Sequence, residues 1–126
     1  MISPLPYFAM KWKEEFNCWD FVRLIYRKEF LIDLPPYHVA AFAAVRQACR
    51  AIEKEEVAPV WQPIENPVEN CVIVMGKPGL RHHVGFMLDP KTVLHLPTNC
   101  HSIAQPIRAL KNNLSTISFF SHAQLR

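Results

Sequence analysis

The chain has 126 residues, of which half are apolar and 20% are charged. This composition excludes a disordered chain, and the length favours a single domain, residues 1–126, that can bury a core without disulfide bonds. The net charge of +3 comes from scattered basic residues, so we expect no nucleic-acid partner. No apolar run approaches the ~20 residues that cross a bilayer, and the N-terminus lacks a basic leader with an apolar core, so we expect neither membrane insertion nor a signal peptide.

The first predicted element is a helix that begins at Cys18, where three helix-start signals converge. Asn17 is a favourable N-cap, and Asp20 is placed to complete a capping box with it. Phe16 and Phe21 are spaced to pack together as a hydrophobic staple. Cys18 therefore lies at the positive end of the helix dipole, which favours the nucleophilic thiolate over the thiol.

Two helices are expected in the first half of the chain. The first runs from Cys18 to about residues 28–31, and the second spans roughly residues 38–56, each with apolar residues at three- and four-residue spacing. Three prolines within residues 59–67 then predict a loop without regular structure, with Trp61 against the core. The predicted buried stripes are Cys18, Phe21, Val22 and Ile25 in the first helix and Phe42, Val45, Cys49 and Ile52 in the second.

The second half of the chain changes to strand patterns. Four strands are expected at residues 71–75, 83–88, 93–96 and 117–120, with one helical turn at residues 107–111. The two middle strands form a hairpin around the turn sequence Asp89-Pro90-Lys91-Thr92. Helices first and strands after predict an α+β fold, in which a helical layer packs on an antiparallel sheet.

Two histidines lie on this predicted hairpin, and a reactive thiol needs a base and a group that orients the base. Side chains alternate along strands, so the pairing register decides whether His83 and His95 share a face. A four-residue loop puts them on opposite faces. A three-residue loop or a β-bulge sets His95 opposite Gly85, on the face of His83, and the glycine then leaves space for both rings. Catalysis by this pair therefore requires a loop with an odd number of residues, or a β-bulge in the hairpin.

The remaining cysteines and histidines are expected to have structural or surface roles. His82 points away from His83 on the strand, so we expect it to be solvated or to contact substrate. The paired ligand spacing of structural zinc is missing, so we expect no metal and no other cofactor. Without a C-x-x-C pair the thiols are expected to be reduced. Buried structural thiols are expected at Cys49, Cys71 and Cys100, and surface imidazoles at His38, His101 and His122.

Three segments together carry a family resemblance. They are N-C-W-D-F-V-R-L-I-Y from Asn17 to Tyr26, H-V-G-F-M-L from His83 to Leu88, and V-L-H from Val93 to His95, in the order Cys, His, His with a step of twelve residues between the histidines. These segments resemble the NlpC family of papain-like cell-wall peptidases, and the resemblance extends over most of the chain. The tryptophan after the cysteine is most similar to the branch found in phage tail-tip proteins.

That resemblance implies a papain-like fold with Cys18 as nucleophile, His83 as base and His95 as the group that orients it. It implies cleavage of amide bonds in peptidoglycan stem peptides without a cofactor. It also implies a protein made in the cytoplasm and acting at the cell wall or periplasm, delivered by phage tail-tip or injection-machine proteins.

Some other residues also match the family pattern, and some depart from it. Tyr7 holds the offset of a tyrosine that lines the family's site, and Trp19 and His82 are further candidates for substrate contact. Asn17 stands where the family has Asp, Asp20 stands where it has Gly, and the Gly-rich approach to the cysteine is missing. These departures motivate one alternative, a catalytically decayed structural subunit of a tail tip. A second alternative is an acyltransferase that uses the same cysteine and histidine, because related folds carry out acyl transfer.

Overall fold

The computed structural model describes residues 1–54, 60–77, 80–111 and 116–125. In these ranges two helices precede an antiparallel sheet of six strands, which confirms the predicted α+β class. The helices are α1 (Cys18–Phe30), α2 (Ala41–Lys54) and the short α3 (Ile107–Lys111), with 3-10 turns at Leu5–Tyr7 and Ala123–Leu125. The strands are β1 (Trp61–Ile64), β2 (Val72–Lys77), β3 (Leu80–Asp89), β4 (Thr92–His95), β5 (Ile103–Pro106) and β6 (Thr116–His122).

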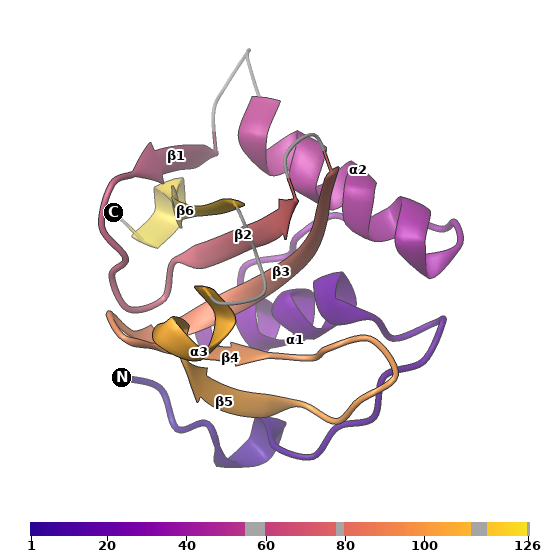
Figure 1. Ribbon diagram of the computed structural model, residues 1–126, viewed down its shortest axis with the longest axis horizontal. Coiled ribbons are helices and arrows are strands. Elements are labelled where there is room, and N and C mark those ends of the chain that lie inside the picture. Colours follow the sequence, from indigo (N-terminus) through magenta and orange to yellow (C-terminus); the bar gives the residue numbers. More distant parts are fainter. Residues whose placement is uncertain (55–59, 78–79, 112–115, 126) are drawn as a thin grey trace.

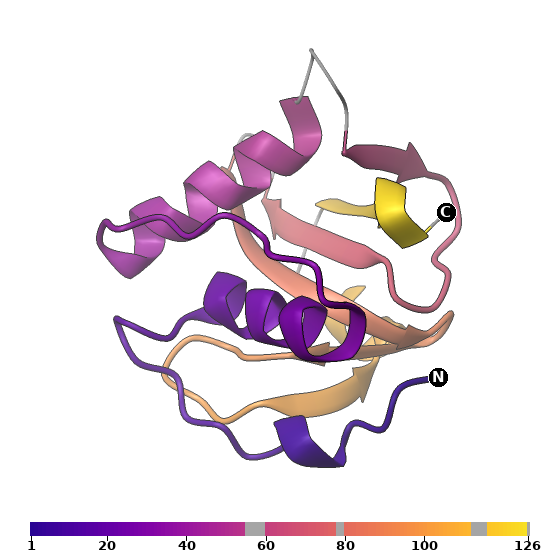
Figure 2. The same cartoon turned by 180° about the vertical axis from the view of Figure 1, so that it is seen from behind.

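The sheet separates two layers of helix. Helices α1 and α2 cover one face, and α3 lies on the other (Figures 1 and 2). The strand order is β1-β6-β2-β3-β4-β5, and every neighbouring pair is antiparallel. The main core lies between the sheet and the two long helices, and a smaller core of Cys71, Ile73, Met75, Met87, Val93 and Ile107 lies beneath α3.

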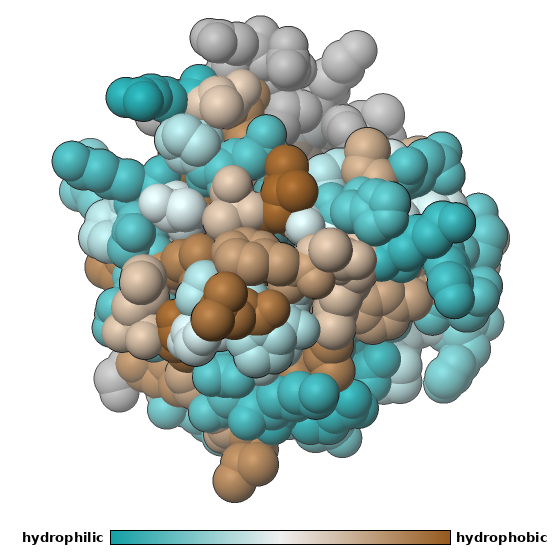
Figure 3. Space-filling view, turned by 90° about the horizontal axis from the view of Figure 1, so that it is seen from below, coloured by the Kyte–Doolittle hydropathy of each residue, from teal (hydrophilic) through white to brown (hydrophobic). Residues whose placement is uncertain are grey.

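The surface mixes polar and apolar areas. On the face seen in Figure 3, hydrophobic residues gather near the centre and hydrophilic residues surround much of them. In the part of the chain that the structure describes, no helix is both long and apolar enough to cross a membrane.

The helical stripes are confirmed in α1 and partly wrong in α2. All four stripe residues predicted for α1 are buried, as are Val45, Cys49 and Ile52 in α2. Phe42, however, is 58% exposed. The buried face of α2 runs through Ala41, and each residue turns the helix by about 100°, so the next position is rotated off that face. The predicted extension of this helix to residue 56 lies partly outside the described residues.

Two strands were not expected from the sequence, and both are edge strands. β1 falls within residues 59–67, where the prolines predicted a loop, and β5 precedes α3 in a stretch with no predicted structure. An edge strand has one neighbour, so β1 accommodates Pro63. Trp61 is buried, as predicted. In β5 three of the four residues are exposed, which leaves no alternating pattern to recognise.

Candidate active site

Helix α1 begins as the local sequence predicts. The side-chain oxygen of Asn17 accepts hydrogen bonds from the backbone N–H groups of Trp19 at 3.0 Å and Asp20 at 3.2 Å. In return, the Asp20 carboxylate accepts one from the N–H of Asn17 at 3.2 Å, which completes the capping box. Phe21 is fully buried, and Phe16 packs against the same core. These contacts fix Cys18 as the first residue of the helix.

The environment of the Cys18 sulfur opposes its ionisation. The residue is only 4% exposed, and this burial raises the pKa of the thiol to about 12. Hydrogen bonds from the N–H groups of Val84, Trp19 and Cys18 lower the pKa in part, and the Asp20 charge raises it further. The expectation that the helix start favours a thiolate is therefore wrong, because burial outweighs the local N–H groups.

The two histidines on the hairpin are hydrogen-bonded to each other. His83 Nε2 lies 2.7 Å from His95 Nδ1, and the rings meet edge to face with centroids 5.0 Å apart. The register between β3 and β4 shifts between Met87 and Asp89, which is the bulge that the sequence required. The predicted shared face of the two imidazoles is thus confirmed.

Gly85 leaves the space in which this pair fits. A Cβ atom at this position would lie 2.8 Å from Val93 Cγ2, 3.2 Å from His95 Cβ and 3.2 Å from Ile73 Cγ2. The first distance is shorter than any ordinary contact between carbon atoms. A residue with a side chain here would therefore push against the strand that carries His95.

A third polar group continues the pair. His95 Nε2 lies 2.6 Å from Gln105 Oε1, so His83, His95 and Gln105 form one row of hydrogen bonds across β3, β4 and β5. Burial lowers the pKa of His95, an effect that the Gln105 bond partly offsets. The sequence did not indicate Gln105, because the strand that carries it was not predicted.

The thiol and the imidazole pair approach β3 from different sides. His83 pairs with Met75, which belongs to the core beneath α3, whereas Cys18 and Val84 belong to the core beneath α1 and α2. The N–H of Val84 donates to the Cys18 sulfur, one residue away from His83. β4 ends at His95, so this contact lies near the place where β3 extends past its neighbour.

A small pocket opens beside the thiol. Its volume is about 180 Å³. It is lined by residues from the start of α1, the segment before it, helix α2 and the loop after β4, namely Asn17, Cys18, Trp12, Glu14, Ala41, Phe42, Val45 and Thr98. The Glu14 carboxylate accepts a hydrogen bond from the N–H of Ala41 at 3.1 Å, at the start of α2. Neither His83 nor His95 is among the described residues that line this pocket, so the pocket reaches the sulfur from the helical side.

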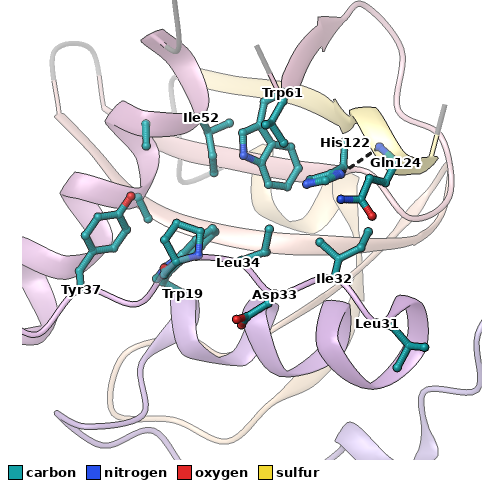
Figure 4. A pocket seen from close by; sticks show the side chains of 14 residues that line it. Trp19, Leu31, Ile32, Asp33, Leu34, Tyr37, Ile52, Trp61, His122 and Gln124 are labelled. Atoms are coloured by element: carbon teal, nitrogen blue, oxygen red, sulfur yellow. Dashed lines mark hydrogen bonds between the residues drawn. The ribbon is translucent and has the colours of Figure 1, made fainter. Parts of the chain in front are cut away.

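Two of the candidates for substrate contact, Tyr7 and Trp19, are not among the residues that line this pocket. The Tyr7 hydroxyl donates to Glu29, which is eleven residues after Cys18 and therefore about 16 Å further along α1. The Trp19 indole donates to the carbonyl of Pro35 at 2.9 Å and lines a separate pocket of about 510 Å³ (Figure 4). The backbone of His82 is part of β3, but its side chain lies outside the described residues.

Two further expectations are corrected. His122 was expected at the surface but is buried, where its ring meets Trp61 at 4.8 Å and its Nδ1 accepts a hydrogen bond from the N–H of Gln124 (Figure 4). It ends β6 with its side chain packed on β1, a pairing that the sequence did not indicate. Cys100 was expected in the core but is exposed, since it follows the turn after β4. His38 and His101 are exposed, as expected.

The chain matches no protein-family model, and no curated protein sequence is significantly similar to it. Among the described residues, no group of three or more histidine, cysteine or acidic side chains could hold a metal ion. All four cysteines are free thiols. The candidate site therefore consists of Cys18, the two paired imidazoles and Gln105.

Proposed function

We propose that the protein is a cysteine peptidase or amidase that cleaves stem-peptide amide bonds of peptidoglycan, with a papain-like arrangement of Cys18, His83 and His95. The observation that carries the proposal is the hydrogen bond between the two imidazoles, in a hairpin register that needs a bulge to form. The first imidazole stands next to Val84, whose N–H contacts the thiol. The choice of peptidoglycan rests on the sequence resemblance to NlpC peptidases, as does delivery by a phage tail or similar machine.

The raised pKa of Cys18 decides how such a reaction would begin. At neutral pH the resting sulfur is a thiol, so His83 must remove its proton as the sulfur attacks the amide carbonyl. The backbone N–H at the start of α1 stabilises the oxyanion. Protonated His83 then passes the proton to the leaving amine. In the second half, His83 takes a proton from water, the resulting hydroxide breaks the thioester, and the proton returns to the Cys18 sulfur.

The first test is digestion of purified sacculi, with mass spectrometry of the released fragments. Cys18→Ala and His83→Ala should each lower the release of muropeptides by a factor of roughly 100 or more, because each removes a group that the reaction requires. Cys49→Ala is the matched control, since it removes a buried thiol on α2 and should leave the activity intact. Undiminished release by the Cys18→Ala protein would exclude the mechanism.

A structural role without catalysis is the second candidate, and the burial of Cys18 favours it. A thiol that is 4% exposed is poorly placed to meet a polymeric substrate unless the pocket beside it widens. The two candidates differ in one measurement. A structural subunit releases no muropeptides from sacculi and leaves Cys18 unmodified by iodoacetamide at every pH at which the protein stays folded, whereas an enzyme releases fragments in a manner that depends on Cys18.

A further inference from the structure

We propose that Gln105 is a positioning residue that determines which ring nitrogens of His83 and His95 carry a proton. The side-chain oxygen of Gln105 lies 2.6 Å from His95 Nε2. The residue takes no direct part in the reaction proposed for Cys18 and His83. The consequence for catalysis rests on the proposed function. The effect on the protons of the two rings does not.

The register of the sheet brings Gln105 to the imidazoles. Gln105 pairs with Val93 on β4, and His95 pairs with Ile103, so Gln105 and His95 are diagonal neighbours on one face of two adjacent strands. Met87 pairs with Val93 in turn, which places β3 on the other side of β4. The three side chains therefore follow one another across the sheet, and each hydrogen bond joins adjacent strands.

The chemistry of the amide oxygen fixes the first proton. An amide oxygen can only accept a hydrogen bond, so the short contact requires a proton on His95 Nε2. Burial lowers the pKa of His95, so its ring is neutral at neutral pH and carries one proton in all. His95 Nδ1 must then be an acceptor.

The second proton follows from the first. His95 Nδ1 lies 2.7 Å from His83 Nε2, and because the former accepts, the latter must donate. A neutral His83 ring then has its lone pair on Nδ1, which is the form that a general base needs. If the amide of Gln105 were reversed, so that its NH₂ group faced His95, both rings would take the opposite form and His83 Nδ1 would carry a proton. One amide orientation thus separates a ring that can take a proton from one that cannot.

The direct test is to observe the ring protons by two-bond ¹H–¹⁵N NMR of the folded protein above pH 7. We expect both His83 and His95 to be protonated on Nε2 in the natural chain. Gln105→Glu keeps an oxygen acceptor at the same place and should keep this pattern. Gln105→Met has a similar length without an amide oxygen and should give a mixture of ring forms. Gln47→Met, an exposed substitution on α2, is the control for the chemical change alone.

Activity on sacculi provides a second readout. Gln105→Met should lower kcat by about 10- to 100-fold, with KM nearly unchanged, because groups that orient a functional imidazole contribute on this scale. Gln105→Glu should restore most of the rate. A wholly structural role for Gln105 would instead lower the activity of both variants in proportion to their loss of folded protein.

Failure of this inference differs from failure of the proposed function. A proton on Nδ1 of His95 in the natural chain, or unchanged ring protons in Gln105→Met, would overturn the role of Gln105 even in an active enzyme. If the ring protons are as expected but sacculi are not cut, the assignment of Gln105 stands and the peptidase proposal fails. Loss of folding in Gln105→Met leaves the natural chain and Gln105→Glu to decide the question.

Discussion

The Cys18 sulfur experiences two opposing influences, and their balance decides its reactivity. Burial dominates and keeps the sulfur protonated, while three backbone N–H groups favour the thiolate. The negative charge of Asp20 raises the pKa of the thiol further. It does so although its carboxylate also accepts a hydrogen bond from the N–H of Asn17 and forms an ion pair with Arg23 at 3.3 Å. The same side chain therefore starts the helix and opposes the charge at its first residue.

Asp20→Asn separates these two effects. An asparagine oxygen can still accept from the N–H of Asn17, so the helix start is kept, while the negative charge that raises the pKa of Cys18 is lost. The pKa of the thiol should fall, and at a fixed pH below that pKa the thiolate fraction should rise. Alkylation of Cys18 by iodoacetamide should therefore be faster in the variant at each pH between 7 and 9. Glu15→Gln removes an exposed carboxylate nearby and should leave the rate unchanged, and slower alkylation of Asp20→Asn would contradict the assignment.

At the scale of elements, the hairpin of β3 and β4 positions the imidazoles through its bulge and through Gly85. The bulge brings the two rings to one face, and the glycine leaves room between Ile73 on β2 and Val93 on β4. Neither feature alone is sufficient. A register without the bulge separates the rings, and a side chain at position 85 displaces the strand that carries one of them.

Gly85→Ala should therefore affect stability and site together. The added Cβ would lie 2.8 Å from Val93 Cγ2, so we expect a loss of about 1–3 kcal/mol in the free energy of unfolding, as for other overpacked cores. Urea denaturation measures this loss. In the folded fraction, the NMR signals of His95 should shift because its Cβ is among the contacted atoms. An unchanged stability would mean that the hairpin yields at this point without strain.

Prediction from the sequence was reliable where the signals are local and failed where they depend on neighbours. The start of α1 is specified by residues within one turn of Cys18, and the structure confirms it. The bulge followed from requiring two histidines on one face. Edge strand β5 carries no burial pattern, so neither the strand nor Gln105 was foreseen. The burial of Cys18 depends on contacts with Val84 on a distant strand, which helix-start signals do not report.

At the scale of the whole molecule, burial of His95 ties folding stability to pH. Burial lowers the pKa of this imidazole below its ordinary value of 6.5, so the unfolded chain takes up a proton that the folded chain resists. The free energy of unfolding should therefore be highest above about pH 6.5 and should fall as the solution is acidified below it, by at most about 1.4 kcal/mol per pH unit from this group.

Urea denaturation at intervals from pH 7.5 to 5 measures this dependence. His95→Asn should flatten the curve in that window, because the titrating ring is gone. His101→Asn, which removes an exposed imidazole, should leave the slope unchanged. Equal slopes in all three proteins would show that His95 does not couple protonation to folding.

The order of the strands in the sheet has a consequence for how the chain folds during translation. Of the six strands that the structure describes, β6 is the last to be synthesised, yet it lies between β1 and β2. A nascent chain that has reached only residue 111 can pair β2 with β3. The other edge of β2, and β1 with it, must await residues 116–122, because β6 is the strand that pairs with both. Such an open edge is a template for association with other chains. The histidine-bearing hairpin can thus form early, whereas the sheet that supports it closes only after residues 116–122 have been made.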